Sequence, residues 1–164
     1  MPREGGSRMA AEDLTRVLDE AGVGYDLLTH VHTISATAEA EALGLATRDV
    51  AKTLIVKTQD GYLRVVLQGS ERLDLRKLRA LLGGNKHDVR LASEEDLGRD
   101  FPEFELGAVP PVGGGRRDPV VVDSRVAEQE ALVLEAGSHE ESVRLATDDV
   151  IRLAHAQVAD VSER

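Results

Sequence analysis

Two apolar segments separated by an Asp-Gly pair constrain the fold of this chain more than any other feature of its sequence. Val50 to Thr58 and Tyr62 to Gln68 are rich in β-branched residues, and Asp60-Gly61 lies between them. An Asp-Gly pair in this position is a strong signal for a tight turn between antiparallel strands. The sequence therefore predicts a β-hairpin over residues 50–68.

Helices and further strands are predicted on both sides of this hairpin. The apolar residues of segment 10–21 have the i, i+3, i+4, i+7 spacing of one helix face: Leu14, Val17, Leu18 and Ala21. Capping residues and apolar patterns predict further helices at 36–43 and 74–82, after Ser93 and after Thr147, and strands at 25–30, 86–91, 120–122 and 131–135. Residues 101–117 are predicted as a shaped loop. This irregular alternation predicts a single α+β domain with a mixed, mostly antiparallel sheet.

The composition is that of a folded protein with one core. The chain has 164 residues, of which 41% are hydrophobic and 30% charged. It has no cysteine, which excludes disulfides, thiolate nucleophiles and Cys-ligated metal sites. No apolar run approaches the ~20 residues that span a bilayer, and the N-terminus lacks the apolar stretch of a signal peptide. We therefore expect a cytoplasmic protein with a disordered lead-in at residues 1–9 and one domain at residues 10–160.

The charge is unevenly distributed along the chain. The net charge is −10, yet residues 52–90 contain nine Lys and Arg against four Asp and Glu. This balance argues against a protein that coats duplex DNA, and four aromatic residues are too few for a platform that stacks single-stranded bases. Two interpretations of the basic segment remain: a solvated surface of mixed sign, or a patch that meets a small anion or the end of a nucleic acid.

Several motifs are poor candidates for chemistry. Gly113 to Arg117 (GGGRR) lacks the spacing of a phosphate-binding loop and no helix clearly follows it, so a flexible turn is favoured. His30 and His32 would share a face of a strand, but no third ligand is near them in sequence, and we expect no metal site. No pattern of a serine nucleophile is present.

Three segments are better candidates for a site. Lys52 lies between apolar neighbours at the start of a predicted strand, where its ammonium either extends to solvent or projects into a cavity. Gly107 to Pro111 (GAVPP) combines a residue that allows close backbone approach with two rigid prolines. Ala136 to His139 is predicted as a loop that brings a hydroxyl and an imidazole together after a strand.

These segments carry a resemblance to a known family. The strings HVHTISATAEAEALGL, VAKTLIVKTQDGYLRVVL, FPEFELGAVPPVG, PVVVDS and EAGSHEESVRLATDDVIRL occur in this order. The chain resembles the YbaK/ProX family of aminoacyl-tRNA deacylases and prolyl-tRNA synthetase editing domains, from about Leu14 to Ala154. It looks most like the freestanding branch. The resemblance implies a barrel-like mixed sheet with flanking helices.

The resemblance also implies roles for individual residues. The catalytic residues it implies are Lys52 and Gly107. Lys52 would hold the tRNA end, and the backbone of Gly107 would approach the ester carbonyl. The substrate-binding residues it implies are Ile34, Thr53, Pro111, Gly137, Ser138 and His139. In that scheme Pro111 fixes its loop, Ser138 and His139 orient the amino group or ribose, and Ile34 lines a pocket for a small amino acid.

The reaction implied is hydrolysis of the ester of a mischarged tRNA. The sequence offers no obvious protein nucleophile, which agrees with a family mechanism in which a ribose hydroxyl of the substrate assists the attack of water. No cofactor or metal is implied. The partners implied are the acceptor end of aminoacyl-tRNA, with residues 52–90 toward the acceptor stem, and a synthetase, but no DNA and no membrane. Two alternatives remain: an inactive tRNA- or synthetase-binding module of the same fold, and an unrelated small-molecule or metal-dependent hydrolase.

Overall fold

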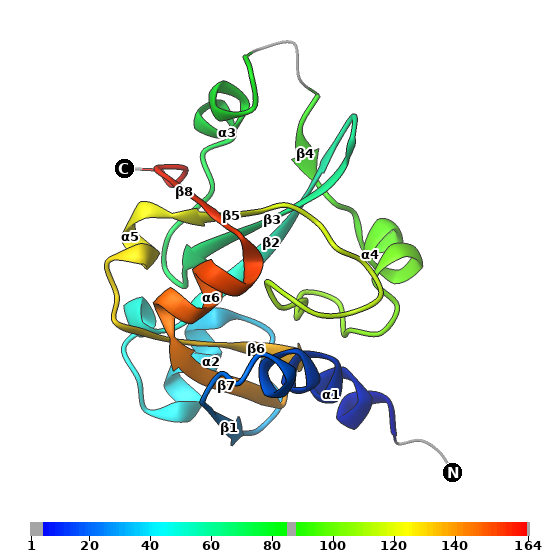
Figure 1. The fold of residues 1–164 in the computed structure, drawn as a ribbon, viewed down its shortest axis with the longest axis vertical. Helices are drawn as coiled ribbons and strands as arrows, with labels where there is room; N and C mark the ends of the chain where they lie inside the picture. Colours follow the sequence, from blue (N-terminus) through cyan, green and yellow to red (C-terminus); the bar gives the residue numbers. More distant parts are fainter. Residues whose placement is uncertain (1–4, 85–87, 164) are drawn as a thin grey trace.

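Two β-sheets form the centre of the molecule (Figure 1). The computed structural model describes residues 5–84 and 88–163. One sheet has the strand order β4-β2-β3-β5-β8. Its strands are β2 (Ala51–Thr58), β3 (Gly61–Gln68), β4 (Arg90–Leu91), β5 (Val120–Asp123) and β8 (Gln157–Ala159). The other has the order β1-β7-β6, with β1 (Tyr25–Thr29), β6 (Ala131–Ser138) and β7 (Glu141–Ala146). The single α+β domain is confirmed, with its strands divided between two sheets.

The predicted hairpin forms two central strands of the larger sheet. β2 and β3 pair antiparallel from Ala51 with Gln68 to Thr58 with Gly61. On its other side β3 pairs with β5 in parallel, so β3 is a central strand. Val65 and Val66 are both fully buried although they project to opposite faces. This burial on both faces explains why β3 is a continuous apolar run instead of an alternating pattern.

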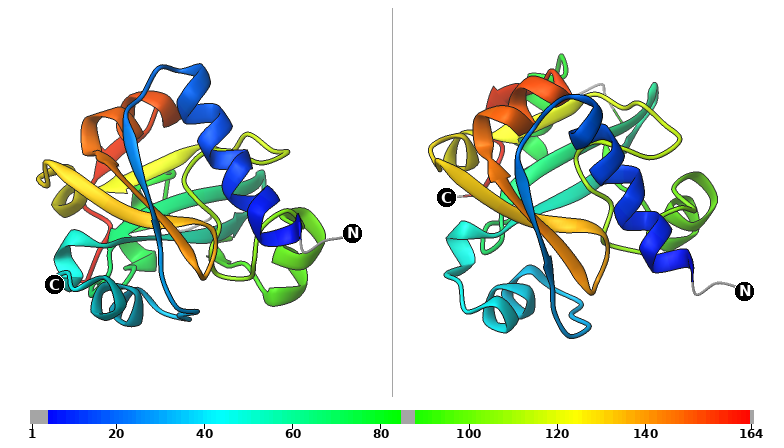
Figure 2. Two further views of the ribbon diagram at one scale, coloured as in Figure 1. Left: turned by 90° about the horizontal axis from the view of Figure 1, so that it is seen from below. Right: turned by 60° about the horizontal axis from the view of Figure 1, so that its bottom comes forward.

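Six α-helices of the described chain surround the sheets. They are α1 (Gly5–Glu20), α2 (Ala36–Leu43), α3 (Leu75–Leu81), α4 (Glu94–Asp100), α5 (Ser124–Ala127) and α6 (Thr147–Ala154); a short 3-10 helix, η1, spans Thr47–Asp49. Helix α1 lies against β6 (Figure 2) and buries Leu14 and Leu18. The predicted caps of α3 and α4 are confirmed, because Asp74 accepts from two backbone N–H groups and Ser93 forms a capping box with Asp96.

The structure differs from the sequence prediction at both ends of the chain. Residues 5–9 belong to α1 where a disordered lead-in is predicted, and residues 1–4 lie outside the described residues. At the last helix the cap is Ala146, and no side chain accepts a hydrogen bond there. Thr147 is instead the first helical residue, and its buried hydroxyl has no hydrogen-bond partner among residues 5–84 and 88–163. The prediction of a Thr147 cap was wrong because β7 runs directly into α6.

Two strands, β4 and β6, differ clearly in extent from their predictions. The strand predicted at 86–91 is reduced to Arg90–Leu91, with residues 85–87 outside the described part. The predicted 136–139 loop was wrong, because β6 continues to Ser138 and pairs with β7. The sequence analysis missed β7, α5 and β8.

Among the described residues, no helix is long and apolar enough to cross a membrane.

Candidate functional site

A cavity of about 410 Å³ lies at the open edge of β2. It is open because β4 pairs only with Val56 and Lys57, which leaves the first half of β2 uncovered on that side. Its lining comes from α2 and the preceding loop, β2, the β4–α4 region, the 107–109 loop and β6: Ile34, Ser35, Ala36, Thr37, Lys52, Thr53, Leu54, Ile55, Gly69, Leu91, Ala92, Leu97, Gly107, Val109 and Glu135. The structure thus brings together four of the predicted site residues: Ile34, Lys52, Thr53 and Gly107.

Lys52 is half-buried in the wall of this cavity. Burial lowers the pKa of its ammonium below the ordinary value, and the Glu71 carboxylate opposes this shift. No acceptor in the described part of the chain pairs with the ammonium. Lys52 therefore presents an available positive charge at the cavity.

The backbone of β2 adds polar groups that the sequence analysis did not identify. Ile55 accepts a hydrogen bond from the N–H of Ala92, so its peptide groups face the outer edge of the sheet. Peptide groups of alternate residues in an antiparallel strand face the same edge. The N–H and C=O of Thr53 therefore also face outward, where no strand covers them. An unpaired strand edge is a ready site for a polar substrate.

Gly107 adopts a backbone conformation that other residues rarely adopt. Its φ is +84°, and a Cβ at this position would lie 3.6 Å from Cε1 of His139. The carbonyl of the preceding residue, Leu106, accepts a hydrogen bond from Nε2 of His139 at 2.6 Å. His139 therefore fixes the peptide that leads into Gly107.

His139 is held on both sides of its ring. Its Nδ1 lies 2.8 Å from Oε2 of Glu135, and its side chain is 10% exposed. Since a carbonyl only accepts, Nε2 must carry a proton, and a second proton lies between Nδ1 and Glu135. Both ring nitrogens are thus used within the protein. We call this arrangement of Glu135, His139 and the Leu106 carbonyl the loop clamp.

Burial and mutual attraction shift the pKa values of both titratable groups of the loop clamp, Glu135 and His139. Burial raises the pKa of the Glu135 carboxyl to about 7, although His139 opposes the shift. Burial alone would lower the pKa of His139, but Glu135 and the Leu106 carbonyl outweigh it and raise that pKa. The pair therefore retains its shared proton near neutral pH.

The other predicted site residues do not line the cavity. Ser138 is fully buried, donates to Oε1 of Glu141 and accepts from the N–H of Glu140, so it closes the β6–β7 turn. The carbonyl of Gly137 accepts from the N–H of Glu105 at 2.8 Å. Pro111 lines a different cavity. These residues, like His139, are therefore absent from the lining of the β2 cavity.

A second buried carboxyl lies on α2. Glu39 accepts a hydrogen bond from the hydroxyl of Ser142, which is also 2.9 Å from Nε2 of His30. Burial raises the pKa of Glu39 to about 7, in spite of the Ser142 hydrogen bond. His30 is thereby separated from His32, which lies 3.8 Å from Glu105 and edge-on to His139. Within residues 5–84 and 88–163, no group of three His, Asp or Glu could hold a metal ion.

The basic segment 52–90 does not form one face. Arg64 is buried, pairs with Asp118 at 3.1 Å and donates to the Pro110 carbonyl at 2.8 Å. Lys57 and Arg90 both pair with Asp96. The sequence analysis expected this segment to meet the acceptor stem only if its cations share a face, and Arg64 does not share one, because it anchors the 107–111 loop to β3.

Comparisons with known proteins identify the family. The aminoacyl-tRNA editing domain model matches residues 29–153, which include Lys52, Gly107 and Glu135. The chain belongs to the aminoacyl-tRNA editing domain family. This confirms the resemblance seen in the sequence.

Relatives in this editing family span most of the chain. One is EbsC of Enterococcus faecalis, a candidate Cys-tRNA(Pro)/Cys-tRNA(Cys) deacylase, 28% identical over 132 residues that cover 80% of this chain and 79% of that protein. The multifunctional Ser/Thr-tRNA deacylase ProXp-y of Escherichia coli is 24% identical over 152 residues, 90% of this chain and 89% of that one. A solved structure of a candidate trans-editing enzyme for prolyl tRNA synthetase superposes on this protein with a TM-score of 0.84 at 27% identity. The match covers 94% of this chain and 98% of that one.

Proposed function

We propose that this protein is a trans-acting deacylase that hydrolyses the ester of tRNA mischarged with a small amino acid. The reaction class follows from the family: the protein is an aminoacyl-tRNA hydrolase of the editing type. Its coverage of freestanding relatives, 79% and 89% of their lengths, supports action in trans. The observation that carries the proposal is the cavity in which Lys52, Gly107 and the open edge of β2 meet.

The cavity supplies the groups that ester hydrolysis requires. The Lys52 ammonium is a charged donor for a phosphate or for the ester region of the tRNA end. The N–H groups of Thr53 and Gly107 are donors for the carbonyl oxygen, which becomes an oxyanion when water adds to the carbonyl carbon. The bond from this carbon to the ribose oxygen then breaks, and the ribose oxygen leaves with a proton. A neighbouring ribose hydroxyl assists the attack, so the protein acts by positioning.

The apolar part of the cavity supports selection by size. Leu54, Ile55, Leu97 and Val109 contribute to its wall, and Ile34 stands at its mouth with 81% of its surface exposed. One methylene changes binding in such a pocket by only about 1–3 kcal/mol, which is why a second, hydrolytic selection step is needed after a synthetase. The bulk of Ile34 favours a small side chain.

The proposed partners follow from the reaction. The substrate is the acceptor end of aminoacyl-tRNA, and likeness to a candidate trans-editing enzyme for prolyl tRNA synthetase supports docking on a synthetase. Such substrates support a cytoplasmic location for the protein. The groups of the cavity need no cofactor for the proposed hydrolysis.

Replacement of the cavity lysine tests this proposal. Lys52→Ala is expected to reduce deacylation of the mischarged tRNA substrate about 100-fold or more, because a charged donor to the reacting region is lost. Circular dichroism should show an unchanged fold. Lys57→Ala is the matched control on the same strand, since its ammonium pairs with Asp96 outside the cavity.

Three other outcomes would refute the proposal. Wild-type turnover by Lys52→Ala would show that Lys52 has no role in the reaction. Loss of wild-type activity on addition of a chelator would indicate a metal-dependent hydrolase. Tight tRNA binding without turnover across a panel of mischarged tRNAs would indicate an inactive binding module.

A further inference from the structure

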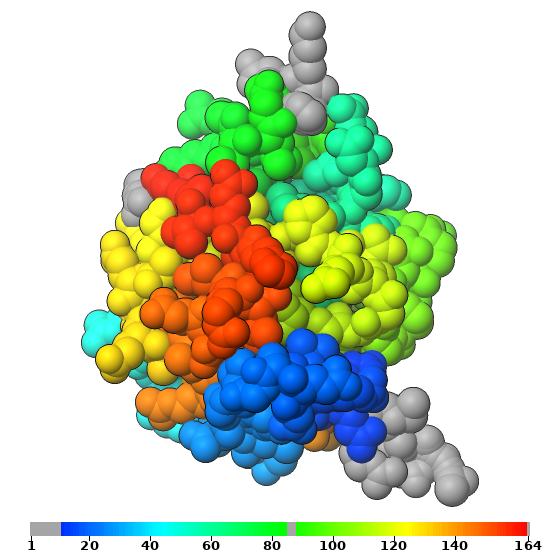
Figure 3. Space-filling view, in the orientation of Figure 1, coloured from blue at the N-terminus to red at the C-terminus, as the bar shows by residue number. Residues whose placement is uncertain are grey.

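A second cavity, of about 350 Å³, lies where residues 111–118 meet α1 and α6. Figure 3 shows these three segments meeting on one face of the molecule. Its lining is Val17, Arg64, Pro111, Val112, Gly113, Gly114, Gly115, Arg116, Arg117, Asp118, Val120, Leu153 and Ala154. None of these residues lines the cavity at the edge of β2. We call it the arginine cavity.

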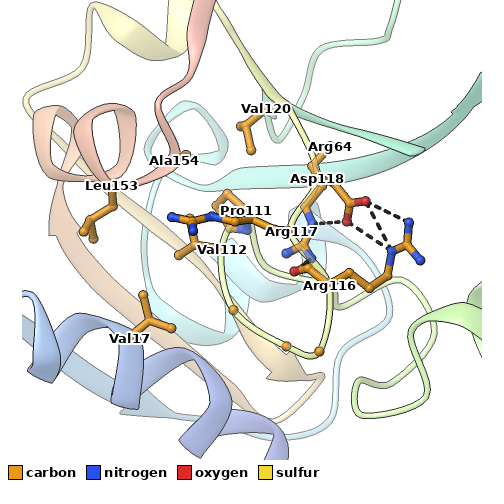
Figure 4. A pocket seen from close by; sticks show the side chains of 13 residues that line it. Val17, Arg64, Pro111, Val112, Arg116, Arg117, Asp118, Val120, Leu153 and Ala154 are labelled. Carbon is orange, nitrogen blue, oxygen red and sulfur yellow. Dashed lines mark hydrogen bonds and ion pairs between the residues drawn. The ribbon is translucent and has the colours of Figure 1, made fainter. Parts of the chain in front are cut away.

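The arginine cavity has more positive than negative charge. Asp118 is its one lining carboxylate, and it pairs with both Arg64 at 3.1 Å and Arg116 at 3.0 Å. Arg117 is exposed and has no hydrogen-bond or ion-pair partner in the described part of the chain. Figure 4 shows its guanidinium pointing away from the Asp118 carboxylate. The lining therefore contains three guanidinium groups and one carboxylate, and only the guanidinium of Arg117 is left unpaired among the described residues, on a protein with a net charge of −10.

The glycine loop of this cavity is held in place, which revises the expectation of a flexible turn. A Cβ on Gly114 would lie 2.7 Å from Cε2 of Phe104, and one on Gly113 would lie 3.0 Å from the Asp13 carbonyl. Behind the loop, the Glu103 carboxylate accepts a hydrogen bond from the N–H of Gly115. The N–H groups of Gly113 and Gly114 have no partner in the described residues. Free N–H groups on a fixed glycine loop are suited to bind an anion.

The opposite wall of the cavity is apolar. Val17 of α1 and Leu153 of α6 contribute to it, together with Val112 and Val120. Inorganic phosphate would use only the arginine side of such a cavity. A larger ligand that bears a phosphate and an apolar body would use both sides.

We propose that the arginine cavity is a second binding site, for the phosphate of a nucleotide unit, with Arg117 as its free charged contact. The sugar and base of the unit lie against the apolar wall, and the N–H groups of Gly113 and Gly114 face the phosphate. The same chemistry is offered by the backbone of tRNA outside its acylated end and by a free nucleotide. The site is distinct from the hydrolytic cavity, and binding to it does not require hydrolysis.

Two measurements on Arg117→Ala test the site. The first is the affinity for uncharged tRNA over a range of salt concentrations; the second is the affinity for adenosine monophosphate. Arg144→Ala is the matched control, since Arg144 is also an exposed arginine without a partner in the described residues but lies on β7. Arg117→Lys retains the charge without the planar guanidinium.

If tRNA supplies the phosphate, Arg117→Ala lowers tRNA affinity about tenfold and reduces the slope of log affinity against log salt by about 1, with Arg117→Lys intermediate. Deacylation of a short aminoacylated 3′-end oligonucleotide stays at the wild-type rate. If a free nucleotide is the ligand, adenosine monophosphate binds the wild type and the Arg144→Ala control but not Arg117→Ala. Identical behaviour of Arg117→Ala and Arg144→Ala in both measurements overturns the proposal. Because uncharged tRNA is used, this result is independent of whether the protein is a deacylase.

Discussion

Removal of the His139 imidazole is expected to damage both catalysis and stability, because the imidazole holds the loop that carries Gly107. His139→Ala leaves the Leu106 carbonyl without a donor and Glu135 without its ring partner. Each buried group that loses its partner costs about 1–3 kcal/mol, so the loss of two partners should lower the free energy of unfolding by about 2–6 kcal/mol. The released peptide before Gly107 then shifts, and a displacement of about 1 Å in a positioned group lowers turnover about 100-fold.

Deacylation kinetics and urea denaturation of the same variants check this prediction. kcat should fall in His139→Ala with a smaller change in KM, since the imidazole contacts the loop and not the substrate. His139→Gln, which can still donate to Leu106, should recover part of both losses. His32→Ala tests the contacts of His139 other than those of the loop clamp, because it removes only the edge-on ring contact with His139 and a long, 3.8 Å approach to Glu105, and it should leave kcat and stability nearly unchanged.

The pH profile separates the loop clamp from direct contact with substrate. The pKa of His139 is raised in the folded protein, so the contribution of the clamp is complete below about pH 6.5 and is lost as the pH rises through the raised value. Wild-type kcat should therefore decline at alkaline pH, and His139→Gln should lose this decline. A His139→Ala variant with wild-type kcat, or one in which KM alone rises, would show that the clamp reasoning is incorrect.

Two further predictions concern stability. Arg64→Met should lower the free energy of unfolding by about 3–5 kcal/mol, because it removes one partner of a buried ion pair; a loss below about 1 kcal/mol in urea denaturation would contradict this. Glu39→Gln should gain about 3 kcal/mol relative to wild type as the pH rises from 4.5 to 8, since the Glu39 pKa is raised from 4.5 to about 7 and its ionisation destabilises only the wild-type fold. Parallel stability curves for the two proteins across this pH range would refute the assignment of a buried carboxyl.

Local signals in the sequence predicted the elements that depend on local interactions. The Asp60-Gly61 pair predicted the turn of the hairpin, and Ser93 with Asp96 predicted a capping box. Lys52 and Gly107, candidates from the sequence pattern, and Ile34, identified through the family resemblance, do line one cavity. Whether these residues bind and hydrolyse the substrate remains a prediction for the variants described above.

The parts that sequence analysis missed depend on contacts between distant segments. Glu135 and His139 are four residues apart, yet their joint role appears only when Leu106 is brought against the ring. From the sequence Arg64 resembles a surface cation. In the structure it is buried and pairs with Asp118, which lies 54 residues later in the chain. The strand β7 was missed because Glu141 and Arg144 interrupt its apolar pattern, although pairing with both β1 and β6 stabilises it.

The pairing of β1 with β7 has a consequence for synthesis of the protein on the ribosome. Tyr25 of β1 pairs with Leu145 of β7. The first strand of the three-stranded sheet can therefore pair only after a segment near the end of the chain has been synthesised. Lys52 emerges well before Glu135 and His139, which complete the cavity and its loop clamp. A nascent chain that ends before β6 has the lysine but neither the wall nor the clamp. The complete cavity and its loop clamp can therefore form only after β6 and the turn that carries His139 have been synthesised.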